Sequence, residues 1–147
     1  MSAAKQKGTA WETALVRVLG TFWAGRFGLA PRRVAQEGFK DSGDLHGLDP
    51  FIAQAKNYKS WEDAIRLGLD GAEKQKVHAG QPYGVAFVKR VRRSVGDGYA
   101  VMSVATFARL LVRLRRAEYL LREHAPADVY DSHTLETTED AAGGFPI

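Results

Sequence analysis

Apolar side chains first recur at helical spacing in residues 8–25, where Thr9 suits an N-cap and Gly25 a helix end. The apolar positions of this face are Trp11, Leu15, Val18 and Phe22. At about 100° per residue, Glu12 falls on the border of this stripe, beside Leu19. We therefore expect an amphipathic helix with an acid that either leans toward a neighbouring sheet or is a solvated flank residue.

Short apolar runs then alternate with turn residues. The segments 32–38, 43–48 and 50–56 have strand character and are separated by Gly, Asp and Pro. Residues 60–80 return to helical spacing, with Ser60 as N-cap and Asp63 completing an approximate capping box. We interpret Gln75, in this helix, as an exposed side chain and assign it no role.

The last third of the chain contains a strand in 82–93 that ends in basic residues, a turn leading into a second strand in 96–104, and a long helix in 105–123. We expect the buried side of that helix to be formed by Phe107, Leu110, Leu111 and Leu114. The element order predicts an α/β domain with a mixed central sheet flanked by helices. We assign residues 1–8 to a flexible basic arm, 9–123 to the domain and 124–147 to an acidic, mobile tail.

Charge divides the chain of 147 residues unevenly. All 21 Lys and Arg precede residue 124, whereas five of the 17 acids follow it, so the body carries 21 minus 12, or +9, and the tail −5. A body this basic favours a polyanionic partner, nucleic acid before membrane, over merely solubilising surface charge. The chain has no cysteine, no signal-peptide pattern and no membrane-length apolar run, which leads us to expect a cytoplasmic protein.

The register of the hairpin formed by 43–48 and 50–56 decides whether its polar residues meet. A two-residue loop at Asp49 and Pro50 would turn Asp44 away from Gln54. A three-residue loop, Leu48 to Pro50, or an equivalent bulge pairs Asp44 with Gln54 and brings Lys56 to the same face. Only the second register makes a site, and the alternative is a hairpin with solvated polar ends.

In the second register the residue types suit a metal-dependent reaction. Asp44 offers an anionic oxygen to Mg²⁺, while Gln54 offers an amide oxygen and Ala55 its main-chain carbonyl. Lys56 is suited to orient or deprotonate an attacking water, and Glu12 to complete the acidic set. We expect Mn²⁺ to substitute for Mg²⁺, which polarises a phosphoryl oxygen and activates its bound water.

The segments "KGTAWETALVRVL", "GDLHG", "IAQAKNYKSW", "GVAFVKR" and "GYAVMSVATFARLL" together resemble the PD-(D/E)xK nuclease superfamily. More narrowly, their order and spacing across about residues 7–115 resemble the Holliday-junction-resolvase-like nucleases of bacteriophages. The resemblance implies a restriction-endonuclease-like core and places the metal acids on Glu12 and Asp44, the strand acid on Gln54 and the lysine on Lys56. It also implies a bacterial host cytoplasm if the chain is phage-encoded.

Gln54 departs from the resemblance, because relatives mostly have Glu there and Gln-x-Lys occurs in branches resembling Mrr-type restriction enzymes. We expect weaker metal binding, with Glu37 an alternative source of the missing carboxylate. The residues expected to follow the DNA backbone, rather than form plain solvated surface, are Lys59, Lys74, Lys76, Lys89, Arg90, Arg92 and Arg93. Tyr58 and Trp61 are expected to pack against the hairpin, or else to stack near an opened junction.

These expectations combine into a Mg²⁺-dependent endonuclease that hydrolyses DNA phosphodiesters and resolves branched DNA. Two symmetric cuts require two sites, so we expect a C₂ homodimer. The alternatives are a restriction-like or nicking nuclease on duplex DNA and a structure-specific DNA-binding protein whose metal site has decayed at Gln54.

Overall fold

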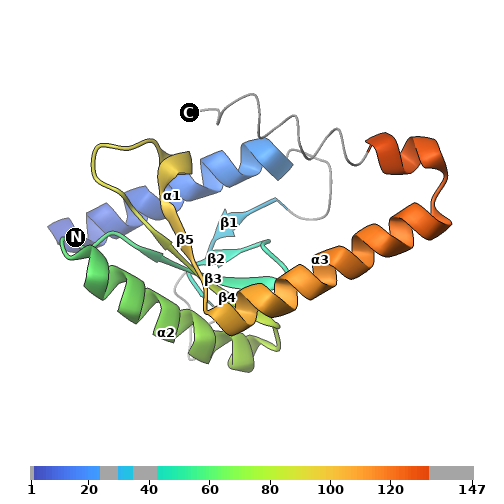
Figure 1. Ribbon diagram of the computed structural model, residues 1–147. Helices are drawn as coiled ribbons and strands as arrows, with labels where there is room; N and C mark the ends of the chain where they lie inside the picture. Colours follow the sequence, from blue (N-terminus) through green and yellow to red (C-terminus); the bar gives the residue numbers. More distant parts are fainter. Residues whose placement is uncertain (1, 24–29, 35–42, 133–147) are drawn as a thin grey trace. The chain divides into compact units, whose positions relative to one another are not determined.

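The structure, a computed structural model, describes residues 2–23, 30–34 and 43–132 (Figure 1). Glu37 lies outside these residues, as does Gly25. The chain divides into two compact units, the first extending to Ser103 and the second beginning at Val104. The first unit holds the sheet, two long helices and every candidate site residue. The second unit is dominated by one helix.

The first unit is built on a five-stranded sheet in the order β1-β2-β3-β4-β5. Neighbouring strands run antiparallel except β3 and β4, which are parallel and are joined through α2. The strands are β1 (Arg32–Arg33), β2 (Leu45–His46), β3 (Phe51–Lys56), β4 (Tyr83–Val88) and β5 (Tyr99–Val101), and a 3₁₀ turn, η1 (Val95–Asp97), precedes β5. The expected α/β class with a mixed sheet flanked by helices is confirmed.

Helix α1 (Ala3–Trp23) covers one face of the sheet, and α2 (Trp61–Ala79) covers the other (Figure 1). Trp11 anchors α1, because its ring is buried and its Nε1–H donates to the carbonyl of Phe87 at 3.1 Å. Leu15 joins it in a core with Ala53 and Ala55 of β3. Trp11, Leu15 and Val18 of the predicted stripe are therefore buried, with Glu12 beside them, and the side chain of Phe22 lies outside the described part of the helix.

Small residues let α2 lie close to the strands. A Cβ on Gly84 would come within 2.9 Å of the Ala72 carbonyl carbon, and one on Gly68 within 3.0 Å of Ala86 and of Lys56. The predicted N-cap of α2 is confirmed, because the Ser60 hydroxyl accepts from the backbone N–H of residue 63 at 3.3 Å. Because α2 lies this close to the sheet, it buries side chains of β3 such as Gln54.

Two helix predictions need correction. Helix α1 begins at Ala3, so Thr9 lies inside it rather than at its N-cap, and residues 3–8 are helical instead of forming a flexible arm. The carbonyl of Thr9 bonds the Thr13 hydroxyl at 2.9 Å, as in a regular helix interior. Good helix formers before Gly8 extend the helix backward, and a plausible cap residue could not reveal this.

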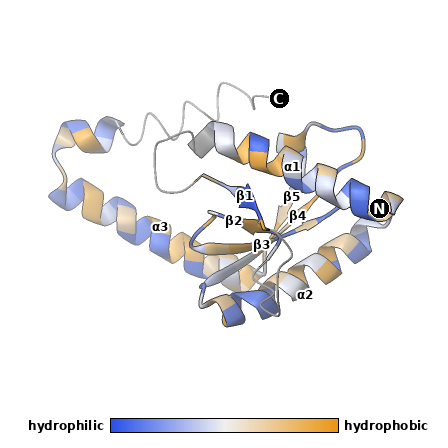
Figure 2. Cartoon of the chain, turned by 180° about the vertical axis from the view of Figure 1, so that it is seen from behind, coloured by the Kyte–Doolittle hydropathy of each residue, from blue (hydrophilic) through white to orange (hydrophobic). Residues whose placement is uncertain are grey.

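The second unit contains α3 (Val104–His124) and a short helical segment at 127–132. Phe107 and Leu114, which we expected on a buried side, are exposed, while Leu110 and Leu111 are half-buried. Hydrophobic and hydrophilic residues alternate along the whole helix (Figure 2). The expected buried side is wrong in its extent, because helical spacing marks an apolar face without showing that anything covers it.

The described part of the tail is helical at 127–132, and residues 133–147 lie outside the described residues. Within the described ranges, none of the helices combines the length and apolar character that crossing a membrane requires.

Candidate active site

The hairpin between β2 and β3 adopts the register that makes a site. Leu45 pairs with Ala53, which is the pairing set by a three-residue loop, and the N–H of Phe51 donates to the Leu48 carbonyl at 2.8 Å to close that loop. Gly47 has φ of 78°, and a Cβ there would lie 2.5 Å from the Ala30 carbonyl oxygen. Only glycine suits this approach. Of the two registers that the sequence left open, the structure has the one set by a three-residue loop.

Asp44 immediately precedes β2, at the point along β3 where the pairing between the two strands stops. Its backbone N–H donates to the carbonyl of Ala53 at 2.9 Å, and its Oδ2 accepts from the N–H of Ala55 at 2.8 Å. The carboxylate thus replaces the partner that a longer β2 would have supplied. The N–H and C=O of one strand residue point to the same edge, so the Ala55 carbonyl faces the edge on which Asp44 lies.

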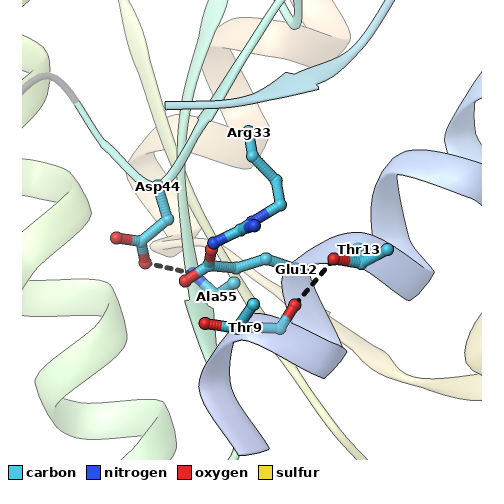
Figure 3. Close-up of polar contacts among 6 residues, drawn as sticks. All are labelled: Thr9, Glu12, Thr13, Arg33, Asp44 and Ala55. Atoms are coloured by element: carbon cyan, nitrogen blue, oxygen red, sulfur yellow. Dashed lines mark hydrogen bonds and ion pairs between the residues drawn. The ribbon is translucent and has the colours of Figure 1, made fainter. Parts of the chain in front are cut away.

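Glu12 reaches the same region from α1. Its Oε2 accepts from the Nε–H of Arg33 on β1 at 2.9 Å, and its side chain is 20% exposed against 41% for Arg33. The Asp44 carboxylate bonds the Ala55 N–H, and the Glu12 carboxylate lies against the Arg33 guanidinium (Figure 3). The acid on the stripe border does lean toward the sheet, and it meets a cation there.

Lys56 lies at the end of β3 and its stem packs on the α2 face, against Gly68. Its ammonium lies 5.8 Å from the centroid of the Tyr58 ring, a cation–π contact, and forms no ion pair with another described residue. The Lys56 carbonyl accepts from the N–H of Lys89 at 3.1 Å. The basic segment that follows β4 therefore begins beside the candidate lysine.

Gln54 is buried on the α2 face, 5% exposed, and its Nε2 donates to Oε1 of Gln75, which is 6% exposed. Its own Oε1 lies 3.6 Å from the point where a Cβ on Gly71 would sit. Gln54 is thus held against α2, and Asp44, which the register places opposite Gln54, is held at the adjoining strand edge by the Ala55 N–H. We expected Gln75 to be exposed, and this interpretation is wrong.

The donor atoms that this region offers to a cation are oxygens. Glu12 and Asp44 supply carboxylates, and Mg²⁺ is commonly held by one or two carboxylates together with water and substrate phosphate. Among the described residues, no three His, Cys, Asp or Glu side chains gather as a metal cluster. A Mg²⁺ ion held by these two carboxylates would therefore need water and substrate oxygens to complete its coordination.

The residues expected to follow the DNA backbone differ in whether their side chains already have a partner within the protein. Lys76 forms an ion pair with Glu73, and Arg90 donates to the Asp97 carbonyl at 3.2 Å while lying 4.7 Å from the Tyr99 ring centroid. The remaining five are exposed or sit in the segment beside Lys56, namely Lys59, Lys74, Lys89, Arg92 and Arg93.

Tyr58 and Trp61 follow β3 and remain 45% and 58% exposed. The ring of Tyr58 does lie against Lys56 of the hairpin strand, but neither ring is buried. Tyr58 and the exposed Lys59 belong to the segment that connects β3 to α2, and Trp61 is the first residue of α2. Two exposed aromatic rings beside a basic side chain form a surface on which bases can stack.

Two site residues were missed, Gln75 and Arg33. Gln75 lies at helical spacing from Ala64, Gly68 and Ala72, the small residues that face the sheet. This spacing was the signal that could have predicted its burial. No comparable signal marks Arg33, because its contact with Glu12 depends on how α1 lies over β1.

Comparison with known proteins adds no relative, since no protein-family model, no curated protein and no solved structure matches the chain.

Proposed function

We propose that this protein is a metal-dependent endonuclease that hydrolyses phosphodiester bonds of branched DNA, with a restriction-endonuclease-like core. The observation that carries the proposal is the anchoring of the Asp44 carboxylate to the Ala55 N–H at 2.8 Å, with the adjoining strand β1 bringing Arg33 into contact with Glu12 (Figure 3). Two carboxylates fixed at a strand edge suit phosphoryl chemistry.

In this proposal Glu12, Asp44 and the Ala55 carbonyl hold Mg²⁺, for which Mn²⁺ substitutes. The ion, when bound, polarises the phosphoryl oxygen and activates a water. The backbone hydrogen bond to Asp44 keeps one carboxylate oxygen in place and leaves its charge unchanged. Such preorganisation avoids reorientation during the reaction.

Lys56 orients the attacking water and offsets charge on the phosphate. Its ammonium has the Tyr58 ring as its neighbour and no carboxylate partner among the described residues. It can therefore turn toward a phosphate without breaking an ion pair. Gln54 acts indirectly in this proposal. Its amide is held by Gln75, and it packs on the same α2 face as the stem of Lys56.

DNA as substrate is supported by the basic residues near the site. Lys89 begins a segment that continues with Arg90, Arg92 and Arg93, and the backbone N–H of Lys89 contacts the Lys56 carbonyl. Branched DNA rather than plain duplex is supported by Tyr58 and Trp61, because unpaired bases at a branch point can stack on exposed rings.

A C₂ homodimer is part of the proposal, because resolving a junction requires paired cuts. Phe107 and Leu114, seven residues apart on one side of helix α3, are both exposed apolar side chains that a partner could cover. Light scattering coupled to gel filtration tests this part, with twice the monomer mass expected.

The test of function uses a four-way junction, a nicked duplex and an intact duplex of matched sequence, each with Mg²⁺, Mn²⁺ or EDTA. Paired symmetric nicks in the junction alone are expected with either ion. Equal cutting of the duplex supports a restriction-like nuclease instead. Junction binding without metal-dependent cleavage supports a structure-specific binding protein and would sink the catalytic proposal.

A further inference from the structure

We infer that Arg33 is a built-in counter-cation that occupies the Glu12 carboxylate in the metal-free protein, and that a divalent cation enters the site by displacing its guanidinium. The inference rests on the proposed function in one respect, namely that Glu12 and Asp44 receive such a cation. It adds a positioning residue that controls how tightly the cation binds.

The backbone fixes Arg33 beside the candidate site. Arg33 pairs with Leu45 across the β1–β2 ladder, and the next N–H, that of Val34, donates to the Asp44 carbonyl at 3.2 Å. Leu45 belongs to the core under α1. Cross-strand partners point to the same face, so Arg33 is directed toward α1 and Glu12.

The contact between Arg33 and Glu12 has few hydrogen bonds to break. Only Nε of Arg33 bonds Glu12, at 2.9 Å, and the two Nη nitrogens have no hydrogen-bond partner among the described residues. A bidentate pair would use the guanidinium fork and hold it more firmly. The acid is also the less exposed partner, 20% against 41%. The carboxylate therefore stays in place while the arginine can swing into solvent.

A guanidinium and a divalent cation cannot share this position, because like charges repel strongly at contact distance. Glu12 and Asp44 contribute the negative charges that would attract the ion, and Arg33 cancels part of that charge. Metal affinity in the free protein is consequently lower than the two carboxylates alone would give. The displaced guanidinium remains at the edge of the site, where its planar donors suit a DNA phosphate.

Arg32 offers a matched control. It precedes Arg33 on β1, is exposed, and pairs with His46, so it points to the opposite face. Arg32→Met and Arg33→Met remove the same charge from the same strand, and the long-range change in the field is nearly equal. A difference between them reports the contact with Glu12.

The experiment is calorimetric titration of Mn²⁺ into the DNA-free protein at low salt. Arg33→Met is expected to bind Mn²⁺ about tenfold more tightly than wild type, and Arg32→Met within about twofold of it. Equal or weaker binding by Arg33→Met, or no binding by any of the three proteins, overturns the inference.

A second readout on the wild-type protein covers the case in which Arg33→Met does not fold. The Nε–H resonance of Arg33, assigned by its loss in Arg33→Lys, is expected to shift as Mg²⁺ is added; an unmoved resonance at saturating Mg²⁺ contradicts displacement. The outcome is separable from nuclease function: DNA cleavage with no effect at Arg33 refutes the inference alone, and displacement without DNA cleavage refutes the proposed function alone.

Discussion

The Oδ2 oxygen of Asp44 accepts a hydrogen bond from the backbone N–H of Ala55 at 2.8 Å, just before β2 begins and beyond the last residue pair between β2 and β3. One carboxylate therefore has a structural role, because it satisfies a strand amide, and a proposed chemical role, because it offers charge to a metal. These two roles respond differently to substitution.

Asp44→Asn is expected to preserve the fold and to reduce metal binding and cleavage. The Asn side-chain oxygen can still accept from Ala55, so the melting temperature should change little, while Mn²⁺ affinity and cleavage fall sharply. Asp44→Ala removes the acceptor as well and should lower the free energy of unfolding by about 1–3 kcal/mol. Thermal melting beside metal titration separates the two; equal destabilisation by both substitutions would show that the charge itself holds the strand edge.

The buried Gln54–Gln75 pair predicts non-additive stability effects. Gln75→Leu leaves the Gln54 amide without its partner and should cost about 1–3 kcal/mol, as should Gln54→Leu. The double substitution should cost less than the sum of the two, because it removes both polar groups together. Urea denaturation of wild type, both single variants and the double variant measures the four free energies of unfolding that this comparison needs. Additive losses would mean that the two amides do not interact in solution.

Trp61 provides a test of the preference for branched DNA. Its ring is 58% exposed, so Trp61→Ala should leave stability nearly unchanged while weakening junction binding by about 1–3 kcal/mol through lost stacking. Binding to a matched duplex should hardly change. Val77, which is also exposed but lies at the other end of α2, is the control position. Fluorescence anisotropy in Ca²⁺ or EDTA provides the measurement, and an equal loss for junction and duplex would remove stacking from the explanation.

The basic residues should contribute unequally to DNA binding. Arg93→Ala is expected to reduce the slope of log affinity against log salt by about 0.9, the value for one lost phosphate contact. Lys76→Ala should alter it less, because Lys76 is already paired with Glu73. Equal slopes for both variants would show that the segment after β4 does not touch the DNA backbone.

Local patterns in the sequence predicted much of the fold. Helical spacing, the Ser60 cap and the apolar runs predicted the element order and the mixed sheet, and the turn residues narrowed the hairpin to two registers, one of which sets Asp44 beside β3 as observed. Each of these is decided by residues close together in the chain.

Features that depend on packing between distant segments were not predicted. The contact between Arg33 and Glu12 requires the position of α1 over β1, and the burial of Gln75 requires α2 to lie close to β3. The exposure of Phe107 is of the same kind, because periodicity identifies an apolar face and cannot identify what covers it. Glu37 stays a prediction, since it lies outside the described residues.

The most direct test of the central claim is the rate of strand cleavage of a labelled four-way junction in Mg²⁺, measured for wild type, Lys56→Met and Lys59→Met. Lys59 is exposed and close in sequence, so it controls for lost charge. At protein concentrations that saturate the junction, so that a lost DNA contact at Lys59 does not limit the rate, wild type and Lys59→Met should cleave at similar rates, and Lys56→Met about 10²–10⁴-fold more slowly, with cleavage abolished by EDTA. Junction cleavage that persists undiminished in Lys56→Met, or no Mg²⁺-dependent cleavage by wild type, would contradict a nuclease site at the end of β3.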